Sequence, residues 1–448
     1  MKQVIKLIFT EEKNKMKKIA LVNHGCAKNL VDSELMLGIL AQNGYEITLD
    51  ETKSDIVIVN TCSFIHDAEK ESVESILTLI NEGKKVIIAG CLIQKYQEEM
   101  KKLFPEAVGF VGTSDFNKID EIIKKLDKTP YEVSAAPHYC YPENVERQQI
   151  TIGASSYIKI ADGCNYSCGY CVIPKLRGKY SSRPIEKIVE EAKHLVKKGV
   201  SEIVLIAQDT TMYGIDIYGE PKIAELIEEL NKIEDLTWLR IMYTYPTGLT
   251  DKLLKTMAKC EKVVKYIDIP LQHKSKNVLK LMQRPISDYT KLIEKIRKIM
   301  PSAAIRTTFI VGYPGETEED FQELYDFVKK SKFDRLGVFE YSREKGTISY
   351  SLPNQVSAKI KKQRRNALMK LQQQISLEIN SSLIGKEIEC IIENISDDGI
   401  ITGRTYKDAP EVDGAIFIKN NDTTQPIPGD VIKVKVTGYS EYDLYSGC

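Results

Sequence analysis

Three cysteines within eight residues, Cys164, Cys168 and Cys171, constrain this chain more than any other stretch of its sequence. Thiolates at such a spacing can bind one corner of a metal centre, because a short loop brings the three sulfurs together. No fourth cysteine lies near them in the sequence, whereas a structural zinc site is normally closed by four ligands. We therefore expect a metal centre with one open position, where chemistry can occur. The alternative is a structural zinc loop that borrows a distant histidine or cysteine.

A regular alternation of strand and helix patterns begins just before this loop. Short runs rich in Val and Ile predict buried strands, and longer amphipathic stretches predict helices between them. The strands are expected at 157–161, 202–207, 238–244, 266–270, 305–311 and 335–341, and the helices at 185–198, 221–233, 250–259, 275–282, 287–299 and 317–331. Six such units predict an incomplete parallel (β/α)6 barrel. Active sites of β/α barrels lie at the C-terminal ends of the strands, and the three-cysteine loop follows the first strand.

The first third of the chain has the same alternation. Strands are expected at 18–22, 55–59, 86–89 and 109–111, and helices at about 30–43, 67–81, 94–102 and 116–126. This order predicts a doubly wound parallel α/β domain with helices on both faces of its sheet. We assign it to residues 17–128, a proline-containing linker to 129–155 and the barrel core to 156–375. Residues 1–15 precede a second methionine, Met16, and are either a poorly ordered extension or a start-site alternative.

Three further cysteines follow the strands of this N-terminal domain. Cys26 comes after the strand at 18–22, Cys62 after the strand at 55–59, and Cys91 after the strand at 86–89. Ligands of open α/β sheets bind at this carboxyl edge. One buried cysteine there would be an ordinary small apolar residue. Three at equivalent strand ends predict a second metal centre, again with an open position.

The last part of the chain changes to an all-strand pattern. A basic helix is expected over 355–375, followed by short, glycine-punctuated strands at 386–393, 399–405, 414–418, 431–437 and 442–445. Five such strands predict a small OB-like β-barrel, which we assign to residues 376–448. Barrels of this kind often bind RNA. From Ser376 onward, however, six basic and thirteen acidic residues give a net charge of about −7, which favours a basic protein partner.

Composition excludes several other classes of protein. Lys and Arg together number 63, as do Asp and Glu, so the whole chain has no polyanion-binding charge. No apolar run is long enough to span a bilayer, and charged residues interrupt the short apolar stretch at the N-terminus. We therefore expect a cytoplasmic protein whose ten cysteines are reduced, which favours metal ligands over disulfides.

The loop from Cys164 to Cys171 resembles the CxxxCxxC motif of the radical S-adenosylmethionine (SAM) superfamily, and Tyr170 matches the aromatic residue before the last cysteine. The resemblance implies that the three cysteines bind a 4Fe–4S cluster whose fourth iron holds SAM. One electron would then split SAM and release a 5′-deoxyadenosyl radical. SAM contacts are implied at strand ends, with Tyr170, Gln208 and Gly312 as candidates. No side chain is assigned a catalytic role, because the clusters supply the radical chemistry.

A three-cysteine α/β domain ahead of such a loop is similar to the methylthiotransferase family, in which that domain carries a second 4Fe–4S cluster associated with the inserted sulfur. On this resemblance, Cys26, Cys62 and Cys91 bind the second cluster. The C-terminal barrel occupies the position of the family's TRAM domain. The family has a tRNA-modifying branch and a branch that modifies a ribosomal protein.

The residues after the first cysteine separate these two branches. The tRNA-modifying branch typically reads Gly-Cys-Gln-Met-Asn, whereas this chain reads Gly25-Cys26-Ala27-Lys28-Asn29 and continues to Asp32-Ser33-Glu34. That sequence resembles the ribosomal-protein branch. Further matches to that branch are Asn60-Thr61-Cys62-Ser63-Phe64-Ile65, Ala68, Glu71-Ser72, Gly90-Cys91-Leu92, Gln208–Gly214 and Asp268–His273.

The resemblance implies methylthiolation of the β-carbon of one aspartate in the twelfth protein of the small ribosomal subunit. One SAM would supply the methyl group and another the radical, because no side-chain base can easily remove an unactivated hydrogen. A low-potential electron donor and a sulfur donor would be needed, and the assembled subunit is a further candidate partner. Two alternatives stay open: a tRNA adenosine methylthiotransferase and a non-catalytic metal-binding ribosome factor.

A basic run, Arg177–Arg183, follows the cluster loop. We expect its arginines to be exposed at the mouth of the site, where they would attract an anionic partner. That partner would be the SAM carboxylate, a substrate carboxylate or ribosomal RNA.

Overall fold

The structure is a computed structural model that describes residues 16–63, 66–142, 144–150, 153–397, 399–419 and 426–447. The expected extension at 1–15 and the motif residues Phe64 and Ile65 lie outside the described residues. The chain forms two compact units, one with residues up to Ala135 and Pro142–Ile150, the other with Ala136–Tyr141 and residues from Thr151 onward. Among the described residues, no helix has the length and apolar character that a membrane span requires.

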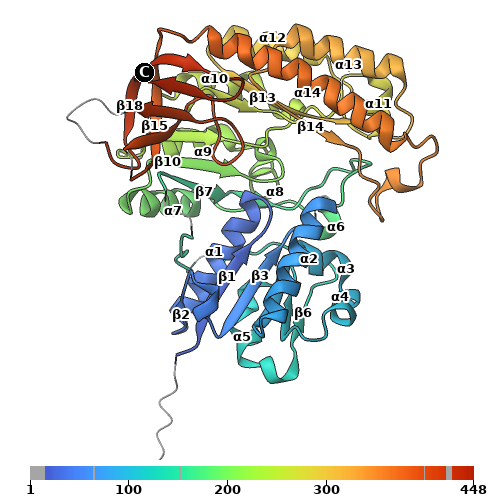
Figure 1. Ribbon diagram of the computed structural model, residues 1–448, viewed down its shortest axis with the longest axis vertical. Helices are drawn as coiled ribbons and strands as arrows, with labels where there is room; N and C mark the ends of the chain where they lie inside the picture. Colours follow the sequence, from blue (N-terminus) through green and yellow to red (C-terminus); the bar gives the residue numbers. More distant parts are fainter. Residues whose placement is uncertain are drawn as a thin grey trace, which may run out of the picture. The chain divides into compact units, whose positions relative to one another are not determined.

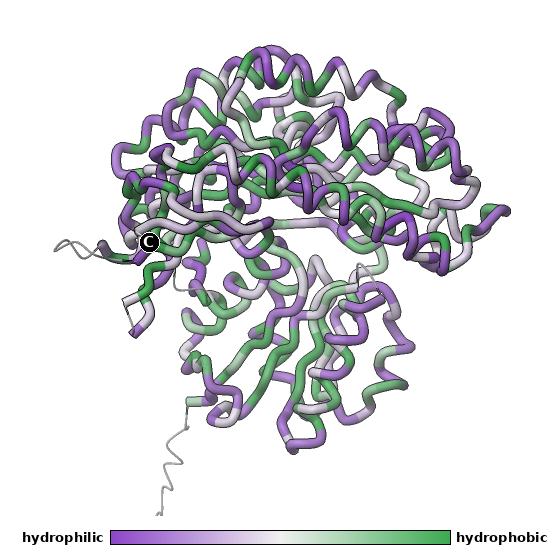
Figure 2. Tube along the Cα trace, turned by 45° about the horizontal axis from the view of Figure 1, so that its top comes forward, coloured by the Kyte–Doolittle hydropathy of each residue, from purple (hydrophilic) through white to green (hydrophobic). Residues whose placement is uncertain are grey.

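The first unit is built on a parallel six-stranded sheet in the order β2-β1-β3-β4-β5-β6 (Figure 1). Its strands are β1 (Lys18–Asn23), β2 (Glu46–Ile47), β3 (Ile56–Thr61), β4 (Lys85–Gly90), β5 (Gly109–Val111) and β6 (Tyr131–Glu132). The four strands expected from the sequence are confirmed. β2 and β6 were not predicted, because two residues are too short to show an alternating pattern. Figure 2 shows the strands of this sheet mainly in the colour of hydrophobic residues.

Helices cover both faces of this sheet, which confirms the doubly wound α/β fold class. They are α1 (Ala27–Gln42), α2 (His66–Asn81), α3 (Cys91–Tyr96), α4 (Glu98–Leu103) and α5 (Ile119–Lys124), with short 3-10 turns at Glu51–Lys53, Phe116–Lys118 and Leu126–Lys128. α2, α3 and α4 share one core with Val57 and Val59 of β3. The alternate residues Ile56 and Ile58 point to the other face, where α1 and α5 pack. The helix expected at 94–102 is broken into α3 and α4 at Gln97, whose φ is +42°.

Residues after the expected N-terminal domain also belong to the first unit. The segment Pro142–Ile150 runs along α1, where Glu34 Oε1 accepts the backbone N–H of Ile150 at 3.2 Å. Arg147 forms an ion pair with Glu34 Oε2 at 3.4 Å. The approach is close enough that a Cβ atom on Gly38 would lie 2.3 Å from the carbonyl oxygen of Glu146.

The second unit contains the six parallel strands expected for the partial barrel. They are β7 (Ser155–Lys159), β10 (Glu202–Ile206), β11 (Trp238–Ile241), β12 (Tyr266–Asp268), β13 (Ala304–Val311) and β14 (Arg335–Glu340). They form two three-stranded sheets, β11-β10-β7 and β12-β13-β14, which meet at a parallel bridge between Leu239 and Val263. The barrel prediction is confirmed.

Helices surround these strands as the sequence predicts. They are α7 (Ile185–Lys197), α9 (Ile223–Asn231), α10 (Asp251–Lys259), α11 (Lys276–Leu281), α12 (Tyr289–Ile299) and α13 (Glu318–Ser331). One apolar core runs through the strands and these helices. Elements that were not predicted are short: α6 (Ile173–Arg177), α8 (Ile215–Tyr218), β8 (Ala161–Asp162), β9 (Ser181–Ser182) and 3-10 turns at Thr210–Met212, Pro246–Gly248 and Ile348–Ser351.

A long helix and a closed β-barrel complete the second unit. The helix, α14 (Ala358–Ser381), packs on β14 and α13 through the buried residues Leu368, Leu371 and Ile375. The closed barrel has the order β15-β16-β17-β19-β18. Its strands are β15 (Glu387–Ile395), β16 (Ile400–Thr405), β17 (Ile416–Lys419), β18 (Val431–Tyr439) and β19 (Leu444–Ser446), which confirms the expected five-stranded domain.

Buried ion pairs join this small barrel to the partial barrel at the end where β10 and β14 begin. Arg404 contacts Glu202 Oε2 at 2.6 Å, and Glu202 Oε1 accepts from Arg240 at 2.7 Å. Arg335, the first residue of β14, pairs with Asp408. The join therefore lies at the end of the strands opposite to the cluster loop.

Candidate cluster sites

The cysteines of the first unit lie at the carboxyl edge of its sheet, as expected. Cys26 caps the start of α1 directly after β1, Cys62 follows β3, and Cys91 is the first residue of α3 after β4. After β1, the chain places β2 on one side of β1 and then β3 on the other side. The direction in which strands are added to the sheet therefore reverses between β1 and β3. Ligands of open α/β sheets bind at such a switch point. The topology thus places Cys26 and Cys62 on the two sides of the crevice.

Asn29 ties these three strand ends together. Its Nδ2 atom donates to the carbonyl oxygens of Thr61, at 3.0 Å, and His24, at 3.1 Å. Its Oδ1 atom lies 3.8 Å from Cys91 Sγ. The sequence marked Asn29 only as part of a family motif. Its role in holding the cysteine loops was missed, because a single asparagine carries no pattern.

Gly25 allows Cys62 to approach the Cys26 loop. Gly25 has φ +104°, a conformation that residues with a side chain rarely adopt. A Cβ atom at this position would lie 2.8 Å from Cys62 Cβ and 3.0 Å from Cys62 Sγ. Only glycine therefore satisfies both the backbone conformation and the close packing.

Further motif residues support the same edge. Asn60 Nδ2 donates to the carbonyl oxygen of Asn29 and to Ser33 Oγ, both at 2.9 Å, and Ser33 Oγ donates to Asn23. The backbone N–H of Cys62 donates to Ser72 Oγ at 3.1 Å. These side chains explain the motif around Ser33 by positioning, without a catalytic role.

The loop of the second unit follows β8 and is held by backbone hydrogen bonds. The N–H of Cys164 donates to the carbonyl oxygen of Gly178 at 3.0 Å, and the N–H of Cys171 donates to that of Cys168 at 3.0 Å. Gly169 donates to the carbonyl oxygen of Met282 at 2.8 Å. These bonds fix the path of the chain through all three cysteines.

Burial makes two thiols of this loop, Cys164 and Cys171, poor anions because it raises the pKa of each. Burial, with a smaller contribution from the neighbouring Cys168, raises the pKa of Cys171 to about 12 and that of Cys164 to about 11. Among the described residues, no three Cys, His, Asp or Glu side chains converge closely enough to hold a single metal ion. In a 4Fe–4S cluster each thiolate binds a different iron, so the three sulfurs need not converge on one point. The three-thiol donor set is one that a 4Fe–4S cluster can use.

The candidate SAM contacts differ in what the structure shows. Gln208 follows β10, and its Nε2 atom donates to Asp162 Oδ1 at 2.6 Å. Its Oε1 atom is buried and has no hydrogen-bond partner among the described residues. Buried acceptors are nearly always satisfied, so this atom fits a contact with a ligand. The Tyr170 hydroxyl accepts from Arg284 Nη1 at 3.3 Å.

Gly312 has an explanation in the packing of the chain. Its φ is +72°, and a Cβ atom there would lie 2.3 Å from Lys361 Cγ. Its N–H donates to Glu316 Oε2 at 2.6 Å. The turn after β13 therefore requires glycine whether or not SAM lies beside it.

The expectation of an exposed cationic mouth at Arg177 and Arg183 is wrong. Both side chains are buried, with 4% and 5% of their surface exposed. Arg177 donates to Asp162 Oδ2 at 3.0 Å, and Arg183 pairs with Glu191 at 2.6 Å. Each guanidinium turns inward because it compensates a buried carboxylate.

An aromatic pair beside the cluster loop was not foreseen from the sequence. Tyr166 stacks on Tyr245 with ring centres 4.2 Å apart, and the Arg284 guanidinium lies 4.5 Å from the centre of the Tyr245 ring. The Tyr166 hydroxyl donates to Asp209 Oδ2 at 3.0 Å. Arg284 follows α11 in a stretch without any motif, so only the fold shows that it lies beside the loop.

Sequence models of three families match successive parts of this chain. They are Uncharacterized protein family UPF0004 at residues 18–112, the Radical SAM superfamily at 158–328 and the TRAM domain at 384–448. Among solved structures, the radical SAM methyltransferase TsrM from Kitasatospora setae is similar, with a TM-score of 0.54. It is 14% identical, and the match covers 72% of each chain. At this identity the likeness concerns the fold alone.

Curated relatives match nearly the whole chain. Proteins named "Ribosomal protein uS12 methylthiotransferase RimO" include one from Clostridioides difficile, 45% identical over 437 residues, with 96% of this chain and 98% of the relative covered. Another from Pelotomaculum thermopropionicum is 46% identical over 437 residues, with 95% and 98% covered. A third from Synechocystis is 44% identical over 430 residues, with 95% and 96% covered. With this identity over almost its full length, the chain belongs to the ribosomal protein uS12 methylthiotransferase RimO family.

Proposed function

We propose that this protein attaches a methylthio group to the β-carbon of an aspartate in ribosomal protein uS12. The observation that carries the proposal is the 45% identity, over 96% of the chain, to a protein named for that activity. The Gly25-Cys26-Ala27-Lys28-Asn29 sequence supports the same choice, because it resembles the ribosomal-protein branch rather than the tRNA-modifying branch.

Two 4Fe–4S clusters are part of this proposal. Cys164, Cys168 and Cys171 would hold one, and Cys26, Cys62 and Cys91 would hold the other. When bound, the clusters and SAM supply the one-electron cleavage that produces a 5′-deoxyadenosyl radical, SAM supplies the methyl group, and the cluster of the first unit would present the sulfur that a donor provides. A low-potential electron donor and a separate sulfur donor would be required, and a ribosomal substrate implies the cytoplasm.

The side chains of the protein would position these groups. Gln208 would orient SAM through its free Oε1 atom, while Asp162 fixes its Nε2 atom. Tyr170 would lie beside SAM with its hydroxyl held by Arg284. Gly312 would contribute by the shape of its turn, since its N–H is already bonded to Glu316. In the first unit, Asn29 would keep the cysteine loops in register.

The C-terminal barrel supports a protein substrate over a nucleic acid. Arg404 is buried in ion pairs with Glu202 and Glu393, so it is not available to phosphate. On the outer face, Lys433 and Lys435 of β18 stand opposite Glu389 and Glu387 of β15 in the strand register. Neighbouring opposite charges cancel, so these strands do not form the basic surface typical of an RNA-binding barrel.

Mass spectrometry of uS12 from cells with and without the gene tests this function most directly. We expect a methylthio mass increase on one aspartate that disappears when the gene is deleted. The purified enzyme should be given uS12 and tRNA in parallel under anaerobic conditions. Methylthioadenosine in tRNA without modification of uS12 would instead identify the tRNA-modifying activity.

Reconstitution with iron and sulfide tests the clusters. The protein should bind about eight irons in two clusters and cleave SAM when reduced by dithionite. Replacing Cys26, Cys62 and Cys91 by alanine should leave about four irons and SAM cleavage intact, but abolish methylthiolation. Bound zinc without SAM cleavage would indicate a non-catalytic metal-binding factor.

A further inference from the structure

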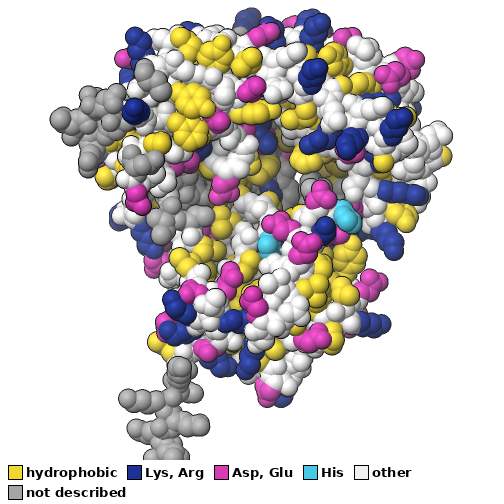
Figure 3. Space-filling model, in the orientation of Figure 1, with side chains coloured by type: hydrophobic (Ala, Val, Ile, Leu, Met, Phe, Trp, Pro, Cys, Tyr) yellow, Lys and Arg dark blue, Asp and Glu magenta, His cyan; other side chains and the backbone are white. Residues whose placement is uncertain are grey.

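The cations of helix α14 point in two directions. Lys361 donates to the carbonyl oxygen of Tyr341 at 2.8 Å, and Arg364 pairs with Glu316 at 2.7 Å, so these two side chains face the partial (β/α) barrel. The other four are exposed and recur along the outer side of the helix. We call them the α14 stripe: Lys359, Lys362, Arg365 and Lys370. Figure 3 shows Lys and Arg side chains over the region where Figure 1 draws this helix.

The α14 stripe lacks the opposite charges that accompany several surface cations elsewhere in this unit. Between Ala358 and Leu377 the helix contains no Asp or Glu. On other helices, Lys187 pairs with Glu190, Lys232 with Glu229 and Lys291 with Asp288. Across the described part of the chain, none of the four stripe residues takes part in an ion pair, so their charge is open to a partner.

This arrangement is unfavourable for the helix itself. Lys359 lies in the first turn of α14, where the helix dipole repels a cation. Cations three or four residues apart also repel each other. Helix α13 follows the usual rule, with Glu318, Glu319 and Asp320 in its first turn. Helix α14 thus carries an unfavourable arrangement of exposed cations that no acidic residue offsets among the residues that the structure describes. Such an arrangement is typical of a functional surface.

The α14 stripe has the chemistry and the rigidity that a phosphate backbone needs. From Lys359 to Lys370 the stripe covers 12 residues, or about 16 Å of helix. Exposed amides, including Gln363 and Asn366, lie among the cations and can also donate to phosphate or ribose oxygens. The inner side is fixed by buried Leu368 and Leu371, so little ordering would be needed on binding.

We infer that the α14 stripe binds the phosphate backbone of ribosomal RNA, and that the enzyme docks on an RNA-containing small subunit rather than only on free uS12. This inference rests on the proposed function, because uS12 is the substrate that brings the enzyme to the subunit. A row of cations with no intervening acid matches the regular negative charge of an RNA strand. The C-terminal barrel is not part of this RNA contact, because its lysines on β18 stand opposite glutamates on β15.

The test compares two variants of the reconstituted enzyme. The stripe variant carries Lys359→Gln, Lys362→Gln, Arg365→Gln and Lys370→Gln, which keep good helix formers in place. The control variant removes the same charge from exposed lysines on α10, α12 and α13: Lys255→Gln, Lys298→Gln, Lys329→Gln and Lys330→Gln. Three probes are used at several salt concentrations: small ribosomal subunits, an RNA duplex of about 20 base pairs, and isolated uS12.

The stripe variant should bind subunits and duplex at least about tenfold more weakly than the control variant. The slope of log affinity against log salt should fall by about 0.7 to 0.9 for each phosphate that the stripe variant no longer neutralises. SAM cleavage and methylthiolation of isolated uS12 should be unchanged. Equally weakened binding in both variants, an unchanged slope, or an equal decrease on isolated uS12 would overturn the inference. Failure of the wild-type enzyme to modify uS12 in any form would instead refute the proposed function, whatever the duplex binding shows.

Discussion

Arg364 on α14 forms a buried ion pair with Glu316, which follows β13, at 2.7 Å. The other carboxylate oxygen of Glu316 accepts the backbone N–H groups of Gly312, at 2.6 Å, and Tyr313, at 3.1 Å. The Tyr313 ring in turn lies at the cluster loop, since a Cβ atom on Gly169 would be 2.6 Å from its hydroxyl. The helix before the C-terminal barrel therefore fixes a turn beside the candidate SAM site.

Replacing Arg364 by methionine should loosen this turn. Glu316 would then be buried without its cation, and breaking a buried pair in this way costs about 3 to 5 kcal/mol. Burial already raises the pKa of Glu316 to about 7, so the carboxyl group would become more readily protonated and release the two N–H groups. We expect a lower thermal midpoint and a higher KM for SAM, with about four irons retained in the cluster of the second unit.

Two further variants separate this effect from general destabilisation. Arg364→Lys keeps one charge near Glu316 and should recover part of the SAM affinity. Arg365→Met removes an exposed neighbouring charge and should leave the KM for SAM unchanged. A KM that is equally altered in Arg365→Met, or unaltered in Arg364→Met, would contradict the role given to the ion pair.

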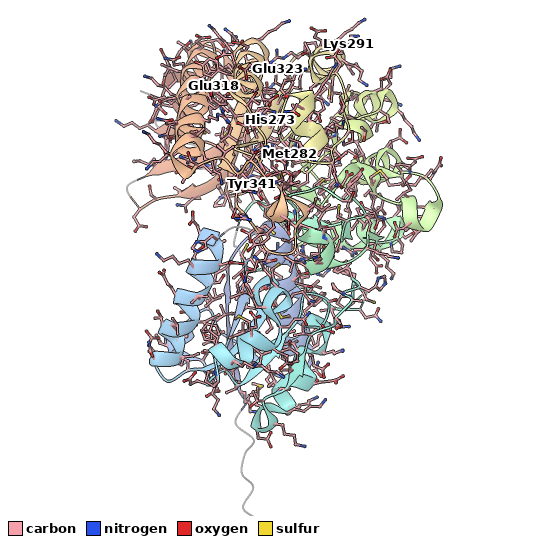
Figure 4. The ribbon with its side chains drawn as sticks, turned by 90° about the vertical axis from the view of Figure 1, so that its right-hand side faces the viewer. His273, Met282, Lys291, Glu318, Glu323 and Tyr341 are labelled. Carbon is pink, nitrogen blue, oxygen red and sulfur yellow. The ribbon has the colours of Figure 1, made fainter. Side chains whose placement is uncertain are left out.

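His273 should make the protein sensitive to acid. The side chain, labelled in Figure 4, is fully buried, and burial lowers its pKa to about 3, while Nδ1 accepts the N–H of Ser275. The unfolded state takes up this proton near pH 6.5, but the folded state does so only near pH 3. The stability that neutral His273 contributes is therefore fully present above pH 6.5 and decreases as the pH falls. Between pH 7 and 5 the decrease should be about 2 kcal/mol.

Denaturant unfolding of wild type and His273→Asn at several pH values measures this decrease. The free energy of unfolding of the variant should change less steeply between pH 7 and 5, whatever its absolute stability. Parallel curves for wild type and His273→Asn would show that the pKa of His273 is the same in the folded and unfolded states, which would contradict this prediction.

Gly25→Ala should disrupt the cysteine site of the first unit. The added Cβ would lie 2.8 Å from Cys62 Cβ, and the φ of +104° is strained for alanine. Gly44 is a matched control, because its φ is +84° but nothing lies within 4 Å of an added Cβ. Both variants should lose about 1 kcal/mol of stability from backbone strain. Only Gly25→Ala should bind about four irons instead of about eight, and equal iron in the two variants would refute the close-packing argument.

The sequence predicts the layers of this fold well, because long apolar runs and helical periods are strong signals. Every strand of the partial barrel and the four longer strands of the N-terminal sheet could be expected, as could the positions of the strand-end and loop cysteines. The two-residue strands β2 and β6 could not, and the break at Gln97 depends on a backbone angle that no residue pattern near it indicates.

The sequence could not predict in which direction the side chains of the site point, and this was its main limit. Arg177 and Arg183 stand in a basic run that looks exposed, yet their partners Asp162 and Glu191 draw them inward. Arg284 reaches Tyr170 only because α11 turns the chain back beside the cluster loop. Such contacts join residues far apart in sequence, so they follow from tertiary packing and not from local spacing.

Arg177→Gln should therefore impair the cluster loop rather than substrate binding. Asp162 accepts from Arg177, from Lys159 at 2.8 Å and from Gln208, and the two cations hold the pKa of Asp162 well below its usual range. Removing Arg177 leaves this buried carboxylate undercompensated two residues before Cys164, so we expect weaker iron binding and slower SAM cleavage. Lys179→Gln, in the same basic run but exposed, is the matched control and should bind iron and SAM normally. If Arg177→Gln instead kept its iron and SAM cleavage but raised the KM for uS12, Arg177 would contact the substrate. Its hydrogen bond to Asp162 would then not explain its role.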